Sequence, residues 1–365
     1  MKITFILPSY PRKPVGGYRV VYEYANHLAK RGHKISVVHP RSVRGLALVS
    51  NSPLLGRFLE YPVRFWRFFI KTKPDWQFID PAVRMLYIPE PLARFIPDAD
   101  AVFTTSWALA DYVRQYPASK GEKFYLFQHY EIWDGPKDEV DATWQSDFHK
   151  IVISKWLYRI GLKLGAEDME YIPNGIDHDH FKILNPIEGR QPYISMMYSN
   201  AAWKGSKDGI KALSLVREKY PDLDAVFFGV SKRNGCIPEW IKYVENPSQD
   251  VLVRDIYNRS SIFLCPSHSE GFALPPAEAM ACGCAIATTD CGGVTDFAEN
   301  EVTALVSPPK NPSALAGNII RILSDDGLRT RLAEAGQIRI KRFTWEKSVN
   351  ALENFLAKAV NQKQF

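Results

Sequence analysis

Features of membrane-spanning and secreted proteins are largely missing from this sequence. No stretch approaches the roughly 18 consecutive apolar residues that a membrane-spanning helix needs. The segment Met1–Pro8 holds one lysine and an apolar run that is too short for the core of a signal peptide. Cysteine is scarce, at 5 of 365 residues, and its number is odd. We therefore expect a cytoplasmic protein whose clustered cysteines are reduced and packed, namely Cys265, Cys282, Cys284 and Cys291.

Signatures of two common ligands are absent or weak. The G-x-G-x-x-G fingerprint of dinucleotide-binding proteins does not occur. Asp-x-Asp pairs, which often hold a metal beside a diphosphate, lie at 98–100, 177–179 and 222–224, each beside an expected strand or in an expected linker. A pattern that recurs in three unrelated places is weak, so we expect no catalytic metal and no cofactor.

The composition is that of a soluble globular protein, with 46% hydrophobic and 24% charged residues, and 365 residues suffice for two domains. Short apolar runs alternate with helix-like segments, which favours parallel sheets with crossover helices. The pattern restarts after a turn-rich segment, 174–189, which separates two doubly wound domains. The expected strands are 3–7, 35–38, 101–104, 124–127, 151–153, 193–198, 225–228, 262–265 and 285–288, and the expected helices are 18–31, 155–164, 206–219, 250–259, one from 276, and 345–360.

The most informative block of the sequence is His268–Ala298. It places Glu270 and Glu278 eight positions apart, around a Gly-Phe-Ala-Leu turn and a Pro-Pro step that suits the start of a helix. A helix N-terminus binds anions such as a diphosphate, and a carboxylate beside it can accept both hydrogen bonds of a sugar diol. The block therefore predicts a nucleotide-sugar site.

This block resembles the E-x7-E signature of glycosyltransferase family four, whose members are retaining enzymes with the GT-B fold. Ala273 and Ala285 stand where the family usually has a glycine and a proline. Further matches follow in family order and cover almost the whole chain: Gly16-Gly17 with the run to His33, then 152–155, 172–177 and 343–346.

The resemblance implies an α/β protein with the GT-B fold, in which two doubly wound Rossmann-like domains face each other across a cleft. It places an acceptor-side domain at 1–180 and a nucleotide-sugar-binding domain at 190–343. The remaining segment, 344–365, is expected to form a helix that crosses back to the first domain. Ligands of such folds bind at the carboxyl ends of the strands.

The resemblance also assigns the donor site, mostly to the second domain. Glu278 would accept the ribose hydroxyls, Glu270 would hold the sugar and the reacting end of the donor, and Lys204 would contact the diphosphate. Backbone N–H groups of the intervening turn would cradle sugar and phosphate oxygens; they belong to Gly271, Phe272, Ala273 and Leu274.

One cation of the family's usual pair is missing. Ser199, followed by Asn200, occupies the position where the family commonly has an arginine. We include both residues in the expected donor site. Arg254 and Lys207 are candidate substitutes for the missing arginine.

In the first domain, Gly16 and Gly17 are expected to let the backbone approach the ligand closely at the start of a helix. His129 follows the strand 124–127, where related enzymes carry a histidine that faces the acceptor. It would hydrogen-bond the donor sugar or support the acceptor hydroxyl, whereas a purely structural histidine is the alternative. His129, Glu270 and Lys204 form the expected catalytic set.

The net charge of +6 is concentrated in one segment. The segment from Arg41 to Lys73 contains seven basic residues and one acidic residue, and its part 57–73 is also rich in aromatic residues. Two interpretations remain open: a core-facing aromatic stripe with a solvated basic side, or a surface that binds an anionic membrane or a lipid-linked acceptor. Nucleic acid is not an expected partner.

The expected function is the retaining transfer of a sugar from a nucleotide-diphosphate sugar to an acceptor hydroxyl, without a metal, in polysaccharide or glycolipid assembly. Segments 124–131 and 193–199 look similar to surface-polysaccharide enzymes, including rhamnosyl transferases. The expected acceptor is a glycan, a lipid-linked molecule or a small molecule. Two alternatives are an inactive GT-B homologue that acts as a binding or scaffold protein, and a GT-B sugar-nucleotide epimerase.

Overall fold

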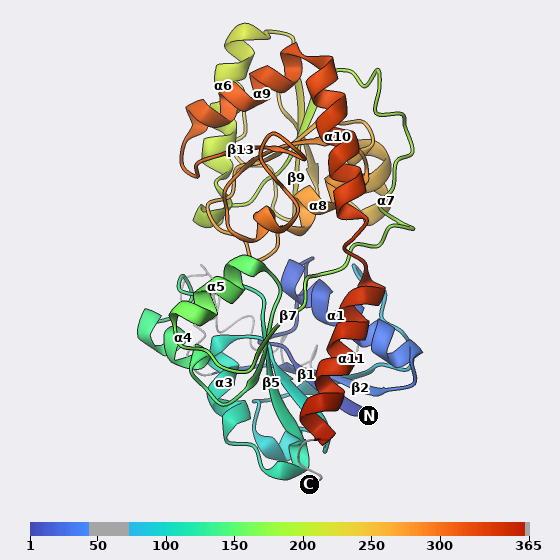
Figure 1. Cartoon of the computed structure of the whole chain (residues 1–365), viewed down its shortest axis with the longest axis vertical. Coiled ribbons are helices and arrows are strands. Elements are labelled where there is room, and N and C mark those ends of the chain that lie inside the picture. Colours follow the sequence, from blue (N-terminus) through green and yellow to red (C-terminus); the bar gives the residue numbers. More distant parts are fainter. Residues whose placement is uncertain (44–72, 362–365) are drawn as a thin grey trace. The chain divides into compact units, whose positions relative to one another are not determined.

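A computed structural model of the chain describes residues 1–43 and 73–361. Each of two compact units is built on its own parallel sheet (Figure 1). Almost all of the basic aromatic segment 57–73 lies outside the described residues. Unit 1 comprises Met1–Ile153, Tyr158–Ile172 and Val349–Phe365, and unit 2 comprises Ser154–Leu157 and Pro173–Ser348.

The sheet of unit 1 has seven strands among the described residues, in the order β3-β2-β1-β4-β5-β6-β7. All neighbouring strands are parallel, and the strands between the two edges of the sheet are mostly apolar and buried, as expected where helices cover both faces. Phe103 stacks between Phe5 and Phe124, at ring-centroid distances of 4.6 and 4.9 Å. The strands are β1 (Lys2–Ile6), β2 (Lys34–Pro40), β3 (Arg84–Ile88), β4 (Ala101–Thr104), β5 (Glu122–Phe127), β6 (His149–Val152) and β7 (Met169–Tyr171).

The last helix of the described chain packs partly with unit 1. Its residue Glu353 forms an ion pair with Arg31 and lies 2.8 Å from His33 Nε2, both just beyond the first helix. Phe355 of the same helix meets Phe124 edge to face. The helices concerned are α1 (Gly16–Lys30), α3 (Trp107–Arg114), α4 (Lys137–Trp144), α5 (Lys155–Lys163) and α11 (Trp345–Asn361).

The sheet of unit 2 has six strands in the described part of the chain, again all parallel, in the order β10-β9-β8-β11-β12-β13. In both sheets the strand order reverses beside the first strand, and folds of this kind bind ligands at such a switch point, at the carboxyl ends of the strands. In unit 2 this switch point lies between β8 and β11. The strands are β8 (Tyr193–Met197), β9 (Asp224–Gly229), β10 (Lys242–Glu245), β11 (Ile262–Cys265), β12 (Ala285–Thr289) and β13 (Leu305–Ser307).

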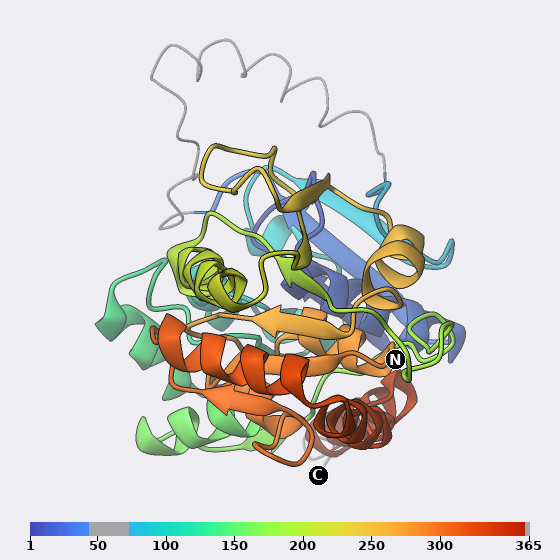
Figure 2. The ribbon, with the colours of Figure 1, turned by 90° about the horizontal axis from the view of Figure 1, so that it is seen from above.

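Helices α6 and α9 pack against each other over the sheet of unit 2 (Figure 2). The buried core of this unit is mostly aliphatic and also includes Tyr198 and Phe227. Helix α7 continues as a π-helix, a form that is frequent at functional sites. The helices of this unit are α6 (Ser206–Lys219), α7 (Gln249–Val251), the π-helix η4 (Leu252–Tyr257), α8 (Leu274–Ala281), α9 (Pro312–Ser324) and α10 (Asp326–Ile340).

The segment expected to link the two domains, 174–189, belongs to unit 2, and the division of the chain falls after Ile172. Asn258 fastens this segment, because its side-chain oxygen accepts the N–H of Leu184 at 2.6 Å. The buried Arg190 guanidinium donates to the carbonyls of Asn185 (2.8 Å) and Cys282 (2.9 Å). These contacts explain why a turn-rich segment packs with one unit rather than running freely between two.

None of the helices in the described ranges combines the length and the apolar character needed to cross a membrane.

Candidate active site

The candidate site is assembled from the two loops that meet at the switch point of unit 2. Lys204 ends a short 3-10 helix (Ala202–Lys204) that follows β8, and Glu270 lies in the loop after β11. Gly205, at φ 60°, allows these loops to meet, since a Cβ there would lie 2.0 Å from the carbonyl oxygen of Pro266. The sequence therefore needs a glycine directly after Lys204.

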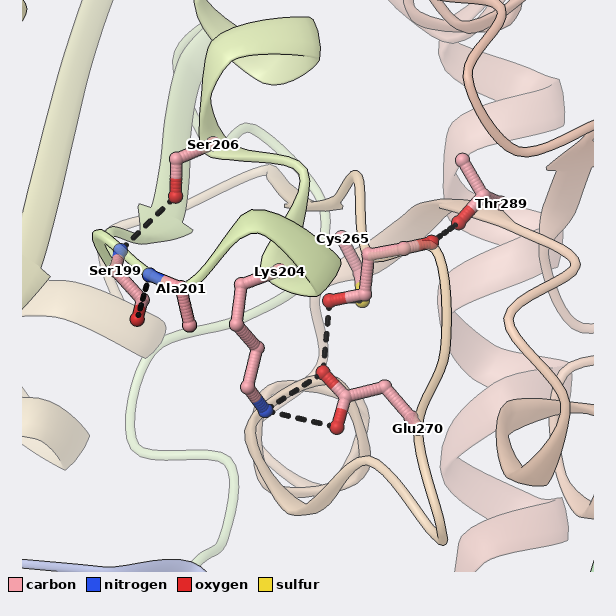
Figure 3. A network of polar contacts seen from close by, with 8 residues as sticks. Ser199, Ala201, Lys204, Ser206, Cys265, Glu270 and Thr289 are labelled. Atoms are coloured by element: carbon pink, nitrogen blue, oxygen red, sulfur yellow. Dashed lines mark hydrogen bonds and ion pairs between the residues drawn. The ribbon is translucent and has the colours of Figure 1, made fainter. Parts of the chain in front are cut away.

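Lys204 and Glu270 form a bidentate ion pair (Figure 3). The Lys204 Nζ lies 2.8 Å from each carboxylate oxygen of Glu270. Burial works against the charge of Lys204, but the neighbouring carboxylate of Glu270 outweighs burial and raises the pKa of the ammonium group. Lys204 therefore keeps its positive charge in this pair. Their pairing brings together two of the three expected catalytic residues.

The backbone and side chain of Glu270 are held from several directions. Its N–H donates to the carbonyl of Cys291 at 2.7 Å, and its own carbonyl accepts the N–H of Gly293 at 2.9 Å. The hydroxyl of Ser267 donates to Oε1 of Glu270 at 2.7 Å. These contacts hold the Glu270 carboxylate in one orientation, so it is preorganised for a ligand. Its side chain is 9% exposed.

Glu278 lies inside α8 and is buried, with 3% of its surface exposed. The phenol of Tyr257, the last residue of the π-helix, donates to its Oε2 at 3.3 Å. Glu270 and Glu278 thus each accept a hydrogen bond from a hydroxyl of a different preceding segment. The sequence analysis found both carboxylates but neither hydroxyl, because a serine or tyrosine carries no distinctive spacing.

The turn between the two carboxylates has an unusual backbone. Ala273 is buried and adopts φ 71° and ψ 69°, the left-handed region that favours glycine. This conformation explains the glycine that the family usually has at this position. The structure gives the N–H groups of Gly271, Phe272 and Ala273 no partner among the residues that it describes. These three donors are suited to ligand oxygens.

Helix α8 begins at Leu274, two residues before the predicted start at Pro276. Pro275 and Pro276 therefore fall within its first turn, where they lack the N–H groups that a helix end normally offers. Leu274 is the first residue of this helical turn. The anion-binding groups expected of a helix N-terminus are thus fewer here, and the preceding turn supplies the unpaired donors.

Ser199 and Asn200 shape the loop after β8 without bringing a cation. The N–H of Ser199 donates to Ser206 Oγ at 2.9 Å, which closes the loop onto α6 (Figure 3). The side-chain oxygen of Asn200 accepts hydrogen bonds from Tyr198 and Asn234, at 3.2 and 3.1 Å. The two candidate substitutes for the missing arginine are exposed, and within the described ranges neither forms an ion pair with Glu270; they are Arg254 and Lys207.

The expected site residues of the first domain lie in unit 1. Gly16 begins α1, and a Cβ on Gly17 would lie 3.3 Å from the side-chain nitrogen of Gln128. The start of α1 and the end of β5 are therefore adjacent. His129 follows at that end, where its Nδ1 accepts the N–H of Tyr130 at 2.8 Å and its ring meets Trp133 edge to face at 4.1 Å.

A further titratable group of unit 1 lies close to His129 in sequence. Glu131 accepts the N–H of Trp107, at the start of α3, at 2.9 Å, and the hydroxyl of Tyr125 at 3.5 Å. Burial raises the pKa of the Glu131 carboxyl to about 7, although the hydrogen bond from Trp107 opposes the shift. This carboxyl ties the loop after β5 to α3.

The clustered cysteines are buried and form no disulfide, as predicted for packed thiols; they are Cys265, Cys282, Cys284 and Cys291. The fifth, Cys236, is exposed. Burial raises the pKa of Cys284 to about 12, so its thiol is protonated at neutral pH. Within residues 1–43 and 73–361, no group of three or more His, Cys, Asp or Glu side chains could hold a metal ion.

The second unit matches a known family. Residues 179–339 fit the family model described as Glycosyl transferases group 1, and this part of the chain is a domain of that family. The D-inositol 3-phosphate glycosyltransferase of Xylanimonas cellulosilytica is 30% identical over 120 residues, which cover 33% of this chain and 29% of that protein. The O-antigen chain mannosyltransferase B of Escherichia coli is 30% identical over 170 residues, 44% of this chain and 43% of that protein. The matched segments thus span less than half of either relative.

Solved structures extend the likeness to both units. The sucrose-phosphate synthase of Thermosynechococcus elongatus gives a TM-score of 0.73 at 18% identity, covering 98% of each chain. Anabaena Alr3699/HepE, in complex with UDP, gives a TM-score of 0.71 at 15% identity over 98% of this chain and 100% of that one. At such identities the likeness concerns the fold, and it confirms the predicted GT-B fold of two Rossmann-like units.

Proposed function

We propose that this chain is a retaining glycosyltransferase that moves a sugar from a nucleotide-diphosphate sugar to an acceptor hydroxyl. The Lys204–Glu270 pair carries the proposal, because it lies at the switch point of the domain that matches the transferase family. In the proposal, Lys204 binds the diphosphate, Glu270 holds the donor sugar and Glu278 accepts the ribose hydroxyls. The unpaired N–H groups of the turn 271–273 receive sugar or phosphate oxygens.

The proposed chemistry needs no metal. The bond from the anomeric carbon to the diphosphate oxygen breaks, while the acceptor oxygen forms a bond to the same carbon on the same face. The acceptor proton passes to a leaving phosphate oxygen. Lys204 stabilises the charge that grows on the diphosphate, as preorganised cations do in transition states. His129 supports the acceptor hydroxyl from unit 1.

We further propose a glycan or lipid-linked acceptor, within polysaccharide or glycolipid assembly. One likeness supports this acceptor class: a relative is named an O-antigen chain mannosyltransferase. A structural neighbour that was solved with UDP and with UDP-glucose supports the nucleotide-sugar donor instead. The rhamnosyl-type similarity of segments 124–131 and 193–199 points to the same kind of pathway.

An anionic membrane surface is the proposed further partner, with the protein in the cytoplasm and at the inner face of the membrane. The proposal rests on the composition of 57–73, where basic and aromatic residues coincide. The double substitution Arg64→Glu/Arg67→Glu should abolish cosedimentation with anionic liposomes at low salt and leave donor hydrolysis unchanged. If the wild-type protein does not cosediment with such liposomes, the result would instead indicate a soluble acceptor.

The transfer proposal is tested by incubating the purified protein with a panel of nucleotide sugars, with and without candidate acceptor glycosides. We expect donor-dependent release of a nucleoside diphosphate that rises with the correct acceptor, and a glycoside product that retains the anomeric configuration. Conversion of the nucleotide sugar into an epimer would support the epimerase alternative. Binding of a nucleotide sugar without any turnover would support the inactive homologue.

A further inference from the structure

We propose that Ser267 is a positioning residue that fixes the Glu270 carboxylate and reserves one of its oxygens for the donor sugar. The inference rests on the proposed role of Glu270 in holding that sugar. It is carried by a short hydrogen bond in a buried place: Ser267 is 3% exposed, and its hydroxyl lies 2.7 Å from Oε1 of Glu270.

The direction of this hydrogen bond follows from the chemistry of the two groups. An ionised carboxylate only accepts, so the single hydroxyl proton of Ser267 points to Glu270. The Ser267 oxygen lies 3.8 Å from the Cys265 sulfur, whose thiol donates to it. Ser267 therefore has no second proton with which to serve another acceptor.

Two adjacent strands hold Ser267 in place. It follows Cys265, the last residue of β11, by two positions, and the hydroxyl of Thr289, the last residue of β12, donates to its carbonyl oxygen. Figure 3 shows Thr289, Cys265 and Glu270 gathered around this point. The hydroxyl that meets Glu270 is consequently fixed from the end of the sheet rather than from a loop tip.

The contacts of the carboxylate distinguish its two oxygens. A carboxylate has about four acceptor positions, two on each oxygen. Lys204 contacts both oxygens at 2.8 Å, and Ser267 contacts Oε1 alone. Oε1 is thereby filled, whereas Oε2 keeps an open position. The donor sugar hydroxyl is therefore assigned to Oε2 of Glu270.

A double-mutant cycle tests this assignment. The variants are Ser267→Ala, Glu270→Gln and their combination, assayed with whichever of UDP-glucose, UDP-N-acetylglucosamine, GDP-mannose and dTDP-rhamnose the wild type turns over. Because misplacing a group by about 1 Å can cost 10²-fold, we expect Ser267→Ala to lower kcat by about 10- to 100-fold. Affinity for the nucleoside diphosphate alone should stay within about threefold, since Glu270 is assigned to the sugar.

The decisive comparison is the effect of Ser267→Ala in the Glu270→Gln background. A residue that acts only through Glu270 loses its effect there, so the two single losses should not add. Thr288→Val is the matched control: it removes a buried neighbouring hydroxyl that donates to the Thr289 carbonyl, and kcat should not change. Wild-type kcat in Ser267→Ala, or equal losses in both backgrounds, would overturn the assignment. Failure of the wild type to turn over any donor would overturn the proposed transferase function itself.

Discussion

The ammonium of Lys204 and the carboxylate of Glu270 face each other at 2.8 Å, across two loops that follow neighbouring strands of one parallel sheet. Each charge neutralises the other in the chain as it stands. In the proposed function, an incoming donor shares Lys204 through its diphosphate and Glu270 through its sugar. One ion pair would then couple recognition of the two halves of the donor.

Replacing Lys204 in the ion pair with Glu270 should distinguish the catalytic role of this lysine from its contribution to stability. We expect Lys204→Met to lower kcat by about 10²–10³-fold, because the leaving diphosphate loses its cation. The variant should also melt at a lower temperature, since the Glu270 carboxylate loses its counter-charge. The double variant Lys204→Met/Glu270→Gln should recover stability in calorimetry without recovering activity. Activity of Lys204→Met within threefold of wild type would assign the diphosphate to another group.

Substitution of the second carboxylate should weaken donor binding and leave the fold intact. Hydrogen bonds to charged groups contribute about 1.5–3 kcal/mol, so Glu278→Gln should lower donor affinity by roughly 10- to 150-fold. Isothermal titration calorimetry measures this change directly. Glu334→Gln, at an exposed position of α10, is the control and should bind like wild type. An unchanged affinity of Glu278→Gln would remove the ribose assignment.

Restoring the usual glycine in the turn should stabilise the protein. The left-handed conformation of Ala273 costs a residue with a Cβ about 1–2 kcal/mol, and the greater freedom of glycine in the unfolded chain offsets part of the gain. Ala273→Gly should therefore raise the free energy of unfolding by about 0.5–1 kcal/mol in denaturant titrations. Ala277→Gly, inside α8, should lower it. A loss of stability in both variants would contradict the strain at Ala273.

The buried carboxyl of Glu131 should make stability depend on pH. Its pKa is about 7 in the folded chain against a usual value of 4.5, so between these values the folded state binds more protons than the unfolded state. This group stabilises the fold most at low pH, and its contribution falls as pH rises from 4.5 through 7, by up to about 3 kcal/mol.

Glu131→Gln keeps an acceptor for the Trp107 N–H and removes the titration. Melting curves of wild type and variant, recorded from pH 4.5 to 8, should diverge as pH rises, with the variant the more stable above pH 7. Parallel curves would show that Glu131 titrates normally in the folded chain.

Chelation of metals should leave activity unchanged, because Lys204 and the turn N–H groups are proposed to stabilise the leaving diphosphate. The measurement is turnover after exhaustive treatment with EDTA, with a chelator-free sample alongside. Loss of activity that manganese or magnesium restores would make one of the Asp-x-Asp pairs functional and would replace the proposed mechanism.

The sequence predicted the centre of each sheet better than its edges. All nine predicted strands occur, within two residues of their bounds, whereas the described part of the chain holds four further strands that were not predicted: β3, β7, β10 and β13. These four form the two edges of each sheet. Three of them contain partly exposed or exposed residues at most positions, and β7 and β13 span three residues each. Edge strands are covered less than central ones, so they lack the continuous apolar runs by which the others were found.

The site was predictable where motif and chemistry coincide, and not where it depends on folding. Spacing and resemblance singled out Glu270, Glu278 and Lys204 as candidate residues. The ion pair between Lys204 and Glu270 could not be predicted in this way, because the two residues lie 66 positions apart in the sequence. The absence of an arginine at Ser199 was visible in the sequence. The hydroxyl of Ser267, by contrast, meets Glu270 only because β11 and β12 end side by side.

Binding of a nucleotide sugar to the second unit is the central claim, and a thermal-shift titration tests it most directly. A ligand at 100 times its dissociation constant stabilises the folded state by about 2.7 kcal/mol, which gives a clear rise in melting temperature. We predict such a rise for the wild type with one nucleotide-diphosphate sugar, and a much smaller rise for Lys204→Met and Glu278→Gln at the same concentration. A wild type that no nucleotide sugar stabilises, or a rise that both variants keep in full, would contradict the claim.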